Sequence, residues 1–161
     1  MRSSKVVEIR NISKFFDGKP ALQNIHLTIE KNEFLVLVGP SGCGKSTLLK
    51  IISGLIKQDA GEILINGIPA NELSPGLRNI SMVFQDLALY PHMTVEENMV
   101  FASKMTKKNP KIIQDKLEIL IDLLKLESLR NRKPNQISGG EKQRVALGRA
   151  MMKEPQIYLM D

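Results

Sequence analysis

The sequence predicts an α/β fold followed by a helical section, and three observations support this prediction. Short apolar or alternating runs up to Phe84 are separated by turn residues, which is typical of strands. One of them, Phe34–Val38, leads through a glycine-rich loop into Leu48–Ile52, which predicts a helix. The periodicity from Val95 to Met152 is helical, and the apolar run Gln156–Met160 predicts a buried strand that returns to the sheet.

The first predicted elements are strands joined by turns. Lys5–Arg10 alternates weakly, and Leu22–Ile29 carries apolar residues at alternate positions after the turn at Asp17-Gly18. Lys31-Asn32 predicts the turn before the strand Phe34–Val38. These patterns place two strands ahead of the glycine-rich loop and one directly before it.

The helix after the loop is expected to end at Ser53-Gly54, because glycine is a natural helix stop. Glu62–Asn66 alternates and predicts a strand, followed by the hairpin signal Asn66-Gly67. Ser74–Gly76 predicts a loop, and Ile80–Phe84 a strand. The α/β section is therefore expected to close with this last strand.

Helices dominate the next section. Val95–Met105 has Thr94 as its candidate N-cap and Glu97 at the capping-box position. Lys111–Leu126 carries a broad apolar stripe, which we expect to pack in a core. Glu141–Met152 is the third predicted helix. The stripe consists of Ile112, Ile113, Leu117, Ile119, Leu120, Leu123, Leu124 and Leu126.

The composition suits a globular domain. The 161 residues are 42% hydrophobic and 25% charged, enough for one core and unlike a disordered polyelectrolyte. The formal net charge is +6, but the basic residues are scattered and aromatic residues make up only 4%, so no nucleic-acid partner is expected. No apolar run reaches signal-peptide or membrane-span length, so a cytoplasmic protein that reaches a membrane only through partners is expected.

The most informative motif lies between Phe34–Val38 and the following helix. It satisfies the pattern G-x-x-x-x-G-K-[ST], in which glycines bring backbone N–H groups against phosphate oxygens at a helix N-terminus. Lys45 is expected to reach the β- and γ-phosphates, and the Ser46 hydroxyl to ligate Mg²⁺. We therefore expect ATP and Mg²⁺ as cofactors. The candidate nucleotide-binding residues are Gly39, Pro40, Ser41, Gly42, Cys43, Gly44, Lys45, Ser46 and Thr47.

Cys43 is the only cysteine, so no disulfide can form within these residues. Because it lies inside the glycine-rich loop, we expect bound Mg·ATP to protect it from maleimides. Alternatively, Cys43 is simply a small residue that fits the loop. This interpretation is compatible with its reactivity.

Further motifs follow in a fixed order. Gln85 stands at the end of a predicted strand, Ser138-Gly139-Gly140-Glu141 opens a predicted helix, and Asp161 follows an apolar strand. With the glycine-rich loop, this order resembles the ATP-binding cassette (ABC) family over essentially the whole chain. Its most specific part is the run from Ile137 to Ala150, which is similar to the family signature, with Ile137 and Glu141 where Leu and Gln are commoner.

The resemblance implies a P-loop NTPase core of ABC type with an inserted helical subdomain. The core would comprise residues 1–86 and 155–161, and the helical subdomain residues 87–154. Gln85 would contact Mg²⁺ and the attacking water, and Asp161 would be the Walker B aspartate that holds Mg²⁺. The signature residues Ser138, Gly139, Gly140 and Glu141 would cover ATP held by a second cassette, in a homodimer or heterodimer. The implied catalytic residues are Lys45, Gln85 and Asp161.

Adenine recognition depends on this resemblance alone. Phe16 lies where the family usually stacks an aromatic ring on adenine. Phe15 is a second candidate, and a core role for the phenylalanine is an open alternative.

The runs Gly39–Leu49 and Leu89–Met99 resemble importer ATPases for carbohydrates and glycerol 3-phosphate. Leu87–Thr94 would then receive a membrane permease subunit at the cytoplasmic face, and a solute-binding protein would act indirectly. His92 would be an interface residue.

In the family a catalytic glutamate and a switch histidine follow the Walker B aspartate. We therefore expect a longer subunit that is an ATPase, a C-terminal part that is missing here, and little or no hydrolysis by these residues alone.

Three other functional classes stay open. A soluble ABC ATPase that acts on nucleic acid or the ribosome would carry coiled-coil insertions, zinc-ligand cysteines or a second cassette, none of which is seen here. Another P-loop nucleotide-binding protein, such as a kinase or GTPase, would leave the run Ile137–Ala150 unexplained. A non-catalytic nucleotide-binding module would describe these residues alone.

Overall fold

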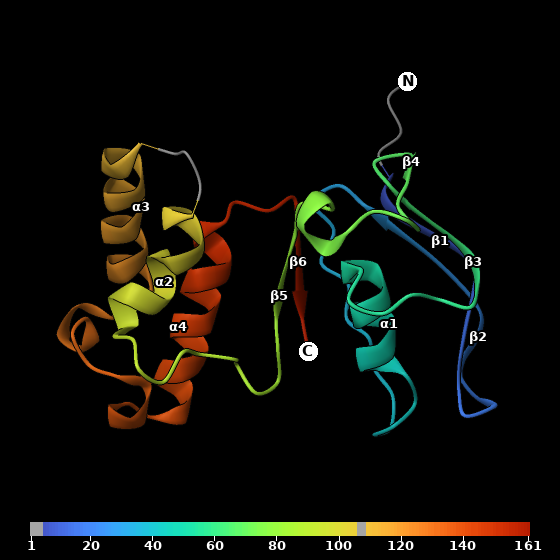
Figure 1. Cartoon of the computed structure of the whole chain (residues 1–161), viewed down its shortest axis with the longest axis horizontal. Helices are drawn as coiled ribbons and strands as arrows, with labels where there is room; N and C mark the ends of the chain where they lie inside the picture. Colours follow the sequence, from blue (N-terminus) through green and yellow to red (C-terminus); the bar gives the residue numbers. More distant parts are fainter. Residues whose placement is uncertain (1–4, 106–108) are drawn as a thin grey trace. The chain divides into compact units, whose positions relative to one another are not determined.

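The computed structural model describes residues 5–105 and 109–161, which form two compact units. The first runs up to Ile80 and includes Asp161, and the second comprises Ser81–Met160. The helices and strands of each unit are labelled in Figure 1. The boundaries expected from the resemblance, at residues 86/87 and 154/155, remain a prediction.

The first unit contains an antiparallel sheet in the strand order β2-β1-β3-β4. The apolar residues Val7, Ile9 and Ile12 of the central strand β1 are at most 2% exposed, and a register shift between Ile9 and Ile12 returns Ile12 to the buried face. Burying each such side chain contributes about 1.5–3 kcal/mol. The predicted turns at Asp17-Gly18 and Asn66-Gly67 are confirmed, with positive φ at all four residues. The strands are β1 (Lys5–Phe16), β2 (Lys19–Glu30), β3 (Ala60–Ile65) and β4 (Ile68–Pro69).

A single α-helix, α1 (Lys45–Ser53), lies with this sheet in the described part of the first unit, and it contacts β2 (Figure 1). Its buried face carries Leu48, Ile51 and Ile52. The helix ends at Gly54, as predicted, where φ is 82° and the N–H bonds back to the last turn. The predicted loop at Ser74–Gly76 overlaps a short 3₁₀ turn, η1 (Pro75–Leu77).

The predicted strand Phe34–Val38 is wrong for this structure. The segment has no assigned secondary structure, and the side chains of Phe34 and Val38 are 87% and 90% exposed. Among the described residues, the sheets contain only β1 to β4 and β5 with β6. An apolar run becomes a strand only where a neighbouring strand accepts its backbone hydrogen bonds, and this segment has no such neighbour.

In its described residues, the second unit combines a two-stranded sheet with three α-helices. The sheet pairs β5 (Ile80–Val83) with β6 (Ile157–Met160). The expectation of a buried last strand is met only at Leu159, since Tyr158 and Met160 are 42% and 57% exposed. The helices are α2 (Val95–Lys104), α3 (Pro110–Leu123) and α4 (Gly139–Met152), with 3₁₀ turns η2 (Glu127–Leu129) and η3 (Pro134–Gln136).

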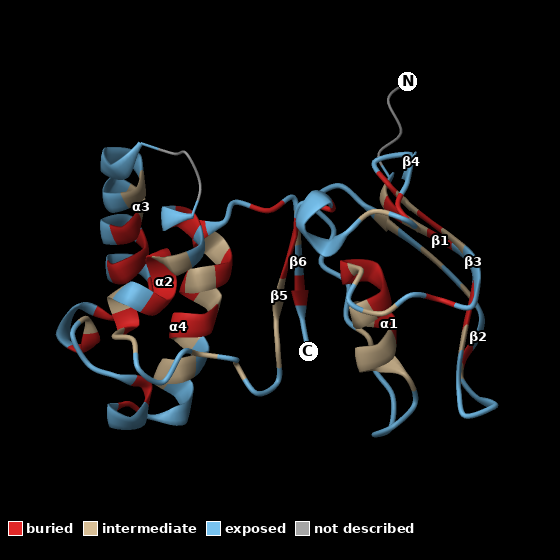
Figure 2. Ribbon diagram, in the orientation of Figure 1, coloured by how far each residue is buried: buried red, intermediate tan, exposed pale blue. Residues whose placement is uncertain are grey.

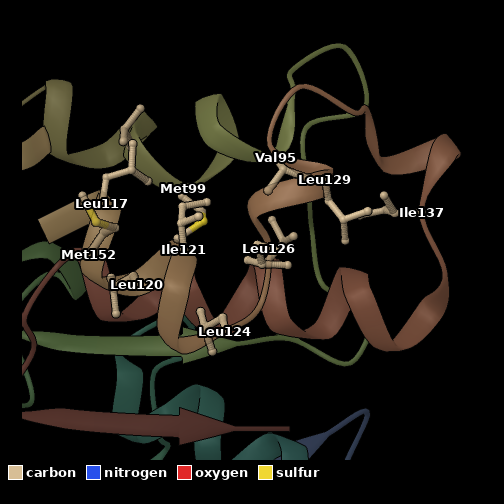
Figure 3. Packing of buried hydrophobic residues seen from close by; sticks show 12 residues of the cluster. Val95, Met99, Leu117, Leu120, Ile121, Leu124, Leu126, Leu129, Ile137 and Met152 are labelled. Atoms are coloured by element: carbon tan, nitrogen blue, oxygen red, sulfur yellow. The ribbon is translucent and has the colours of Figure 1, made fainter.

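The inner faces of α2, α3 and α4 share one apolar core (Figure 3). Met99 from α2, Leu117 from α3 and Val145 from α4 are fully buried in it. The predicted N-cap of α2 is confirmed, because Thr94 and Glu97 form the capping box. No helix in residues 5–105 and 109–161 is long and apolar enough to cross a bilayer.

The predicted stripe on α3 is too wide. Ile112, Ile119 and Leu123 are 58%, 65% and 61% exposed, and the outer surface of α3 is largely pale blue in Figure 2. These three residues lie seven and four positions apart, so they form a second row that points away from the row of Leu117, Leu120 and Leu124. Only the latter row faces α2 and α4 in the core.

Candidate functional site

The glycine-rich loop owes its shape to Gly42 and Gly44. Both have positive φ, 80° and 97°, which glycine adopts without strain. Gly44 also lies against β2, where a Cβ atom would come within 2.5 Å of the Ala21 carbonyl oxygen. Two independent constraints therefore disfavour any side chain at position 44: the positive φ angle and the close approach of β2.

Lys45 lies at the centre of this loop. Its Nζ donates to the carbonyl oxygens of Gly39 and Pro40, both at 2.8 Å, and lies 3.6 Å from Cys43 Sγ. The loop thus bends around an ammonium group. Cys43 is exposed, as its proposed reaction with maleimides requires.

The start of α1 has the properties of an anion site. Gly44 is its N-cap and offers no side-chain oxygen to the first N–H groups, and no acidic residue stands in the first turn. The positive end of the helix dipole and these N–H groups favour phosphate oxygens. The local structure therefore suits the nucleotide phosphates predicted from the motif.

Asp161 and Ser46 meet at the same helix end, although 115 positions separate them in the chain. The Ser46 hydroxyl donates to Asp161 Oδ1 at 2.6 Å. A hydroxyl and a carboxylate are oxygen ligands of the kind that Mg²⁺ prefers when phosphates and water complete its shell. No group of three or more His, Cys, Asp or Glu side chains among the described residues forms a metal cage by itself. The pair therefore fits a cation that also binds a substrate phosphate.

Phe16 ends β1 at the hairpin whose second strand contacts Gly44. Its ring is 46% exposed, and the ammonium of Lys14 lies 5.5 Å from the ring centroid. Lys14 is held by Asp59, whose carboxylate also accepts the Phe15 N–H. These two hydrogen bonds lower the pKa of Asp59, the bond from Lys14 most. Phe15 is 43% exposed, so exposure does not separate the two adenine candidates.

Gln85 lies in the second unit, in the turn that follows β5, and is exposed. The turn closes with a hydrogen bond from Leu87 N–H to the Phe84 carbonyl. Asn98 is fully buried and binds the next stretch: its Oδ1 accepts from Tyr90 N–H, and its Nδ2 lies within 3.2 Å of the Tyr90 and Met93 carbonyls. His92 is exposed.

The signature residues form the start of α4. Ser138 is the N-cap: its Oγ accepts from Glu141 N–H at 3.3 Å, and the Glu141 carboxylate accepts from Ser138 N–H at 2.6 Å. The hydrogen bond from Ser138 N–H lowers the pKa of Glu141, so this carboxylate stays ionised at neutral pH. Added Cβ atoms at Gly139 and Gly140 would meet nothing within 4 Å, so the backbone there is open to approach.

Three polar side chains that the sequence did not single out hold backbone carbonyls in place. Arg78, only 4% exposed, donates to the carbonyls of Ile51, Ile52 and Leu73 and so caps the C-terminal end of α1. Burial lowers the pKa of its guanidinium. Asn98 and Arg149 act similarly in the second unit. No local pattern marks Arg78 and Arg149, because all but one of their acceptors are at least 26 positions away, whereas the acceptors of Asn98 lie four to eight positions before it.

Comparisons with known proteins add independent findings. The family model for "ABC transporter" matches residues 22–161. The sn-glycerol-3-phosphate import ATP-binding protein UgpC of Bordetella avium is 47% identical over 156 residues, which are 96% of this chain and 43% of that protein. The spermidine/putrescine import ATP-binding protein PotA of Acetivibrio thermocellus is 44% identical over 161 residues, which are 100% of this chain and 46% of that protein.

The fold comparison agrees. A dimeric structure of the ATP-binding cassette MJ0796 in a post-hydrolysis state, bound to ADP and Pi, matches with a TM-score of 0.84 and 36% identity. The match covers 96% of this chain and 73% of that chain. It confirms the predicted P-loop NTPase fold of ABC type. The chain spans less than half the length of the two curated relatives named above, and together these matches show that it belongs to the ABC transporter family.

Proposed function

We propose that this chain forms the nucleotide-binding part of an ATP-hydrolysing subunit of an importer. The observation that carries this proposal is the hydrogen bond from the Ser46 hydroxyl to Asp161 at the start of α1. Asp161 would serve as the Walker B aspartate beside the phosphate loop. Lys45 would exchange its bonds to loop carbonyls for bonds to the β- and γ-phosphates. Phe16, or Phe15 beside it, would stack on adenine.

Mg²⁺ would be held at Ser46 and Asp161. Its charge would stabilise negative charge that develops on the transferred phosphoryl group. The protein's own residues position the phosphates: the loop N–H groups bind oxygens, Lys45 neutralises charge, and Asp161 orients the Ser46 hydroxyl. Hydrolysis itself needs a residue that positions water, and we propose that the longer protein supplies it.

A second cassette is proposed as the direct partner. Ser138, Gly139 and Gly140 form an open helix start that suits a phosphate, and Glu141 is tied back to the Ser138 N–H. The MJ0796 structure, a dimer bound to ADP and Pi, supports a pairing of cassettes. In this pair each signature would cover nucleotide on the other cassette. Closure of the pair would accompany ATP binding, and hydrolysis would reopen it.

The proposed permease contact is the stretch Leu87–Thr94. In the second unit a pocket of about 260 Å³ lies beside it, lined by Phe84, Tyr90, Phe101 and Arg149 among others. Aromatic side chains around a concave site are common where a partner residue inserts. Binding there would hold the subunit at the cytoplasmic face of the membrane through the permease.

The transported solute is proposed to be a sugar or glycerol phosphate. The glycerol-3-phosphate relative supports this choice, whereas the similarly distant spermidine/putrescine relative favours polyamines. Uptake of labelled glycerol 3-phosphate, maltose and spermidine by the assembled importer separates these classes. Uptake of spermidine alone would contradict the proposed solute and leave the ATPase proposal intact.

Asp161→Asn tests the ATPase proposal in the full-length subunit. It keeps the side-chain shape and removes the negative charge that a cation needs, so we expect ATP hydrolysis to fall about 100-fold or more. Asp122→Asn, on the exposed face of α3, is the matched control and should keep wild-type activity. Steady-state phosphate release is the measurement. Wild-type hydrolysis by the Asp161→Asn variant would contradict the proposal.

A further inference from the structure

The backbone just after Gln85 is unusual for residues with side chains. Leu87 and Ala88 have φ values of 61° and 41°, in the left-handed region that such residues avoid. Two such residues in succession persist only where surrounding contacts impose them. The contacts that impose this conformation come from α4.

Arg149 supplies them. One guanidinium nitrogen donates to the Ala88 carbonyl at 2.6 Å, and the other donates to the Leu87 carbonyl at 2.8 Å. The guanidinium also lies 5.9 Å from the centroid of the Tyr90 ring. A planar fork with two fixed donors matches two adjacent carbonyls, which the single ammonium of lysine cannot do. Arg149 thus binds three successive parts of this stretch.

The helix that carries Arg149 is the helix that begins at the signature residues. Arg149 stands on the last turns of α4 (Gly139–Met152), whose first turn is capped by Ser138. Gly148, directly before it, approaches α2 so closely that an added Cβ would lie 2.6 Å from Met99 Cε. A rigid helix therefore connects the signature residues to the carbonyls of Leu87 and Ala88.

The stretch has a second anchor that differs in kind. Asn98, on α2, binds Tyr90, Met93 and Thr94 through its side-chain amide. Arg149 holds residues 87 and 88 from α4, so the two helices hold adjacent parts of one stretch. A shift of α4 against α2 would consequently strain the backbone between residues 88 and 90.

We propose that Arg149 is a positioning residue, which ties Leu87 and Ala88 to α4 so that movement of the signature helix displaces the backbone after Gln85. The inference rests on the proposed function, because it uses nucleotide binding at the signature as the source of that movement. Tyr90 is the natural reporter, since its ring lies against Arg149 and its backbone is bound by Asn98.

The test uses the full-length subunit labelled with 3-fluorotyrosine, with the Tyr90 resonance assigned by its loss in Tyr90→Phe. Mg·ATP should shift this resonance in the wild type. Arg149→Met keeps the apolar stem but removes both donors, so the shift should disappear while the dissociation constant for Mg·ATP stays within about twofold. Arg149→Lys should show only part of the wild-type shift in the Tyr90 resonance. Asp122→Asn, at an exposed position of α3 outside the signature run, should behave as wild type.

A purely structural role would lower the unfolding temperature of Arg149→Met but leave the ATP-dependent shift in the folded protein. A wild-type shift in Arg149→Met, or no shift in the ATP-saturated wild type, would therefore overturn the proposal. If Arg149→Met fails to fold, a full wild-type shift of the Tyr90 resonance in Arg149→Lys would also overturn the proposal. Failure of the proposed function is recognised separately, because Mg·ATP would then not bind the wild type in the parallel titration.

Discussion

Buried polar side chains that bind backbone carbonyls carry much of the local order in both units. Arg78 is the clearest case, since its guanidinium serves Ile51 and Ile52 at the end of α1 and Leu73 before η1. A cation at a helix C-terminus also interacts favourably with the helix dipole. Gly54 leaves room for the Arg78 guanidinium, because a Cβ atom at position 54 would lie 2.6 Å from Arg78 Nε. Arg78 therefore anchors the C-terminal end of α1.

Arg78→Met should destabilise the protein. It removes this donor from the carbonyls of Ile52 and Leu73, while the Ile51 carbonyl keeps the hydrogen bond from Gly54 N–H. Each unsatisfied buried group costs about 1–3 kcal/mol, so we expect a loss of roughly 2–6 kcal/mol. Urea denaturation of the full-length subunit measures this loss. Lys57→Met, which removes an exposed ion pair with Glu72, is the control and should cost less than about 1 kcal/mol. Equal effects of the two substitutions would contradict the assigned role of Arg78.

At the scale of elements, local signals predicted the helices better than the strands. The caps at Thr94, Ser138 and Gly54 depend on neighbours within a few residues, so the sequence contains their whole cause. Phe34–Val38 has an amino-acid composition that suits a strand, but a strand also needs a neighbouring strand to pair with. The sequence of the segment alone does not identify that neighbour. The prediction that the outer apolar row of α3 is buried was wrong for a similar reason. Periodicity shows which apolar residues share a face of the helix, but not how many of them neighbouring elements cover.

Hydrogen exchange tests the explanation for Phe34–Val38. We expect its amides to exchange without protection in the 161-residue chain, because no described strand accepts their hydrogen bonds. In the full-length subunit we predict exchange at least about 100-fold slower, through pairing with a strand from residues outside this chain. The amides of β1 should be protected in both and serve as the control. Unprotected exchange of 34–38 in the full-length subunit would contradict this explanation.

At the scale of the whole molecule, the candidate residues fall into two sets. The phosphate loop, Phe16 and Asp161 belong to the first unit, and Gln85 and the signature belong to the second. The sequence could predict the loop, because its glycines, lysine and serine are adjacent in one motif. It could predict the role of Asp161 only through the family resemblance, since the contact with Ser46 spans 115 positions. Arg149 lies within the run that resembles the family signature, but its contacts to Leu87 and Ala88 depend on the three-dimensional structure.

We propose that the loop around Lys45 binds the phosphates of Mg·ATP, and calorimetric titration of the full-length subunit measures this binding. Lys45→Ala removes charge-assisted hydrogen bonds to the phosphates, so we expect binding about 100-fold weaker, or ~3 kcal/mol. Lys50→Ala, on the last turn of the same helix, should bind Mg·ATP as the wild type does. Unchanged affinity in Lys45→Ala, or an equal loss in Lys50→Ala, would contradict the claim.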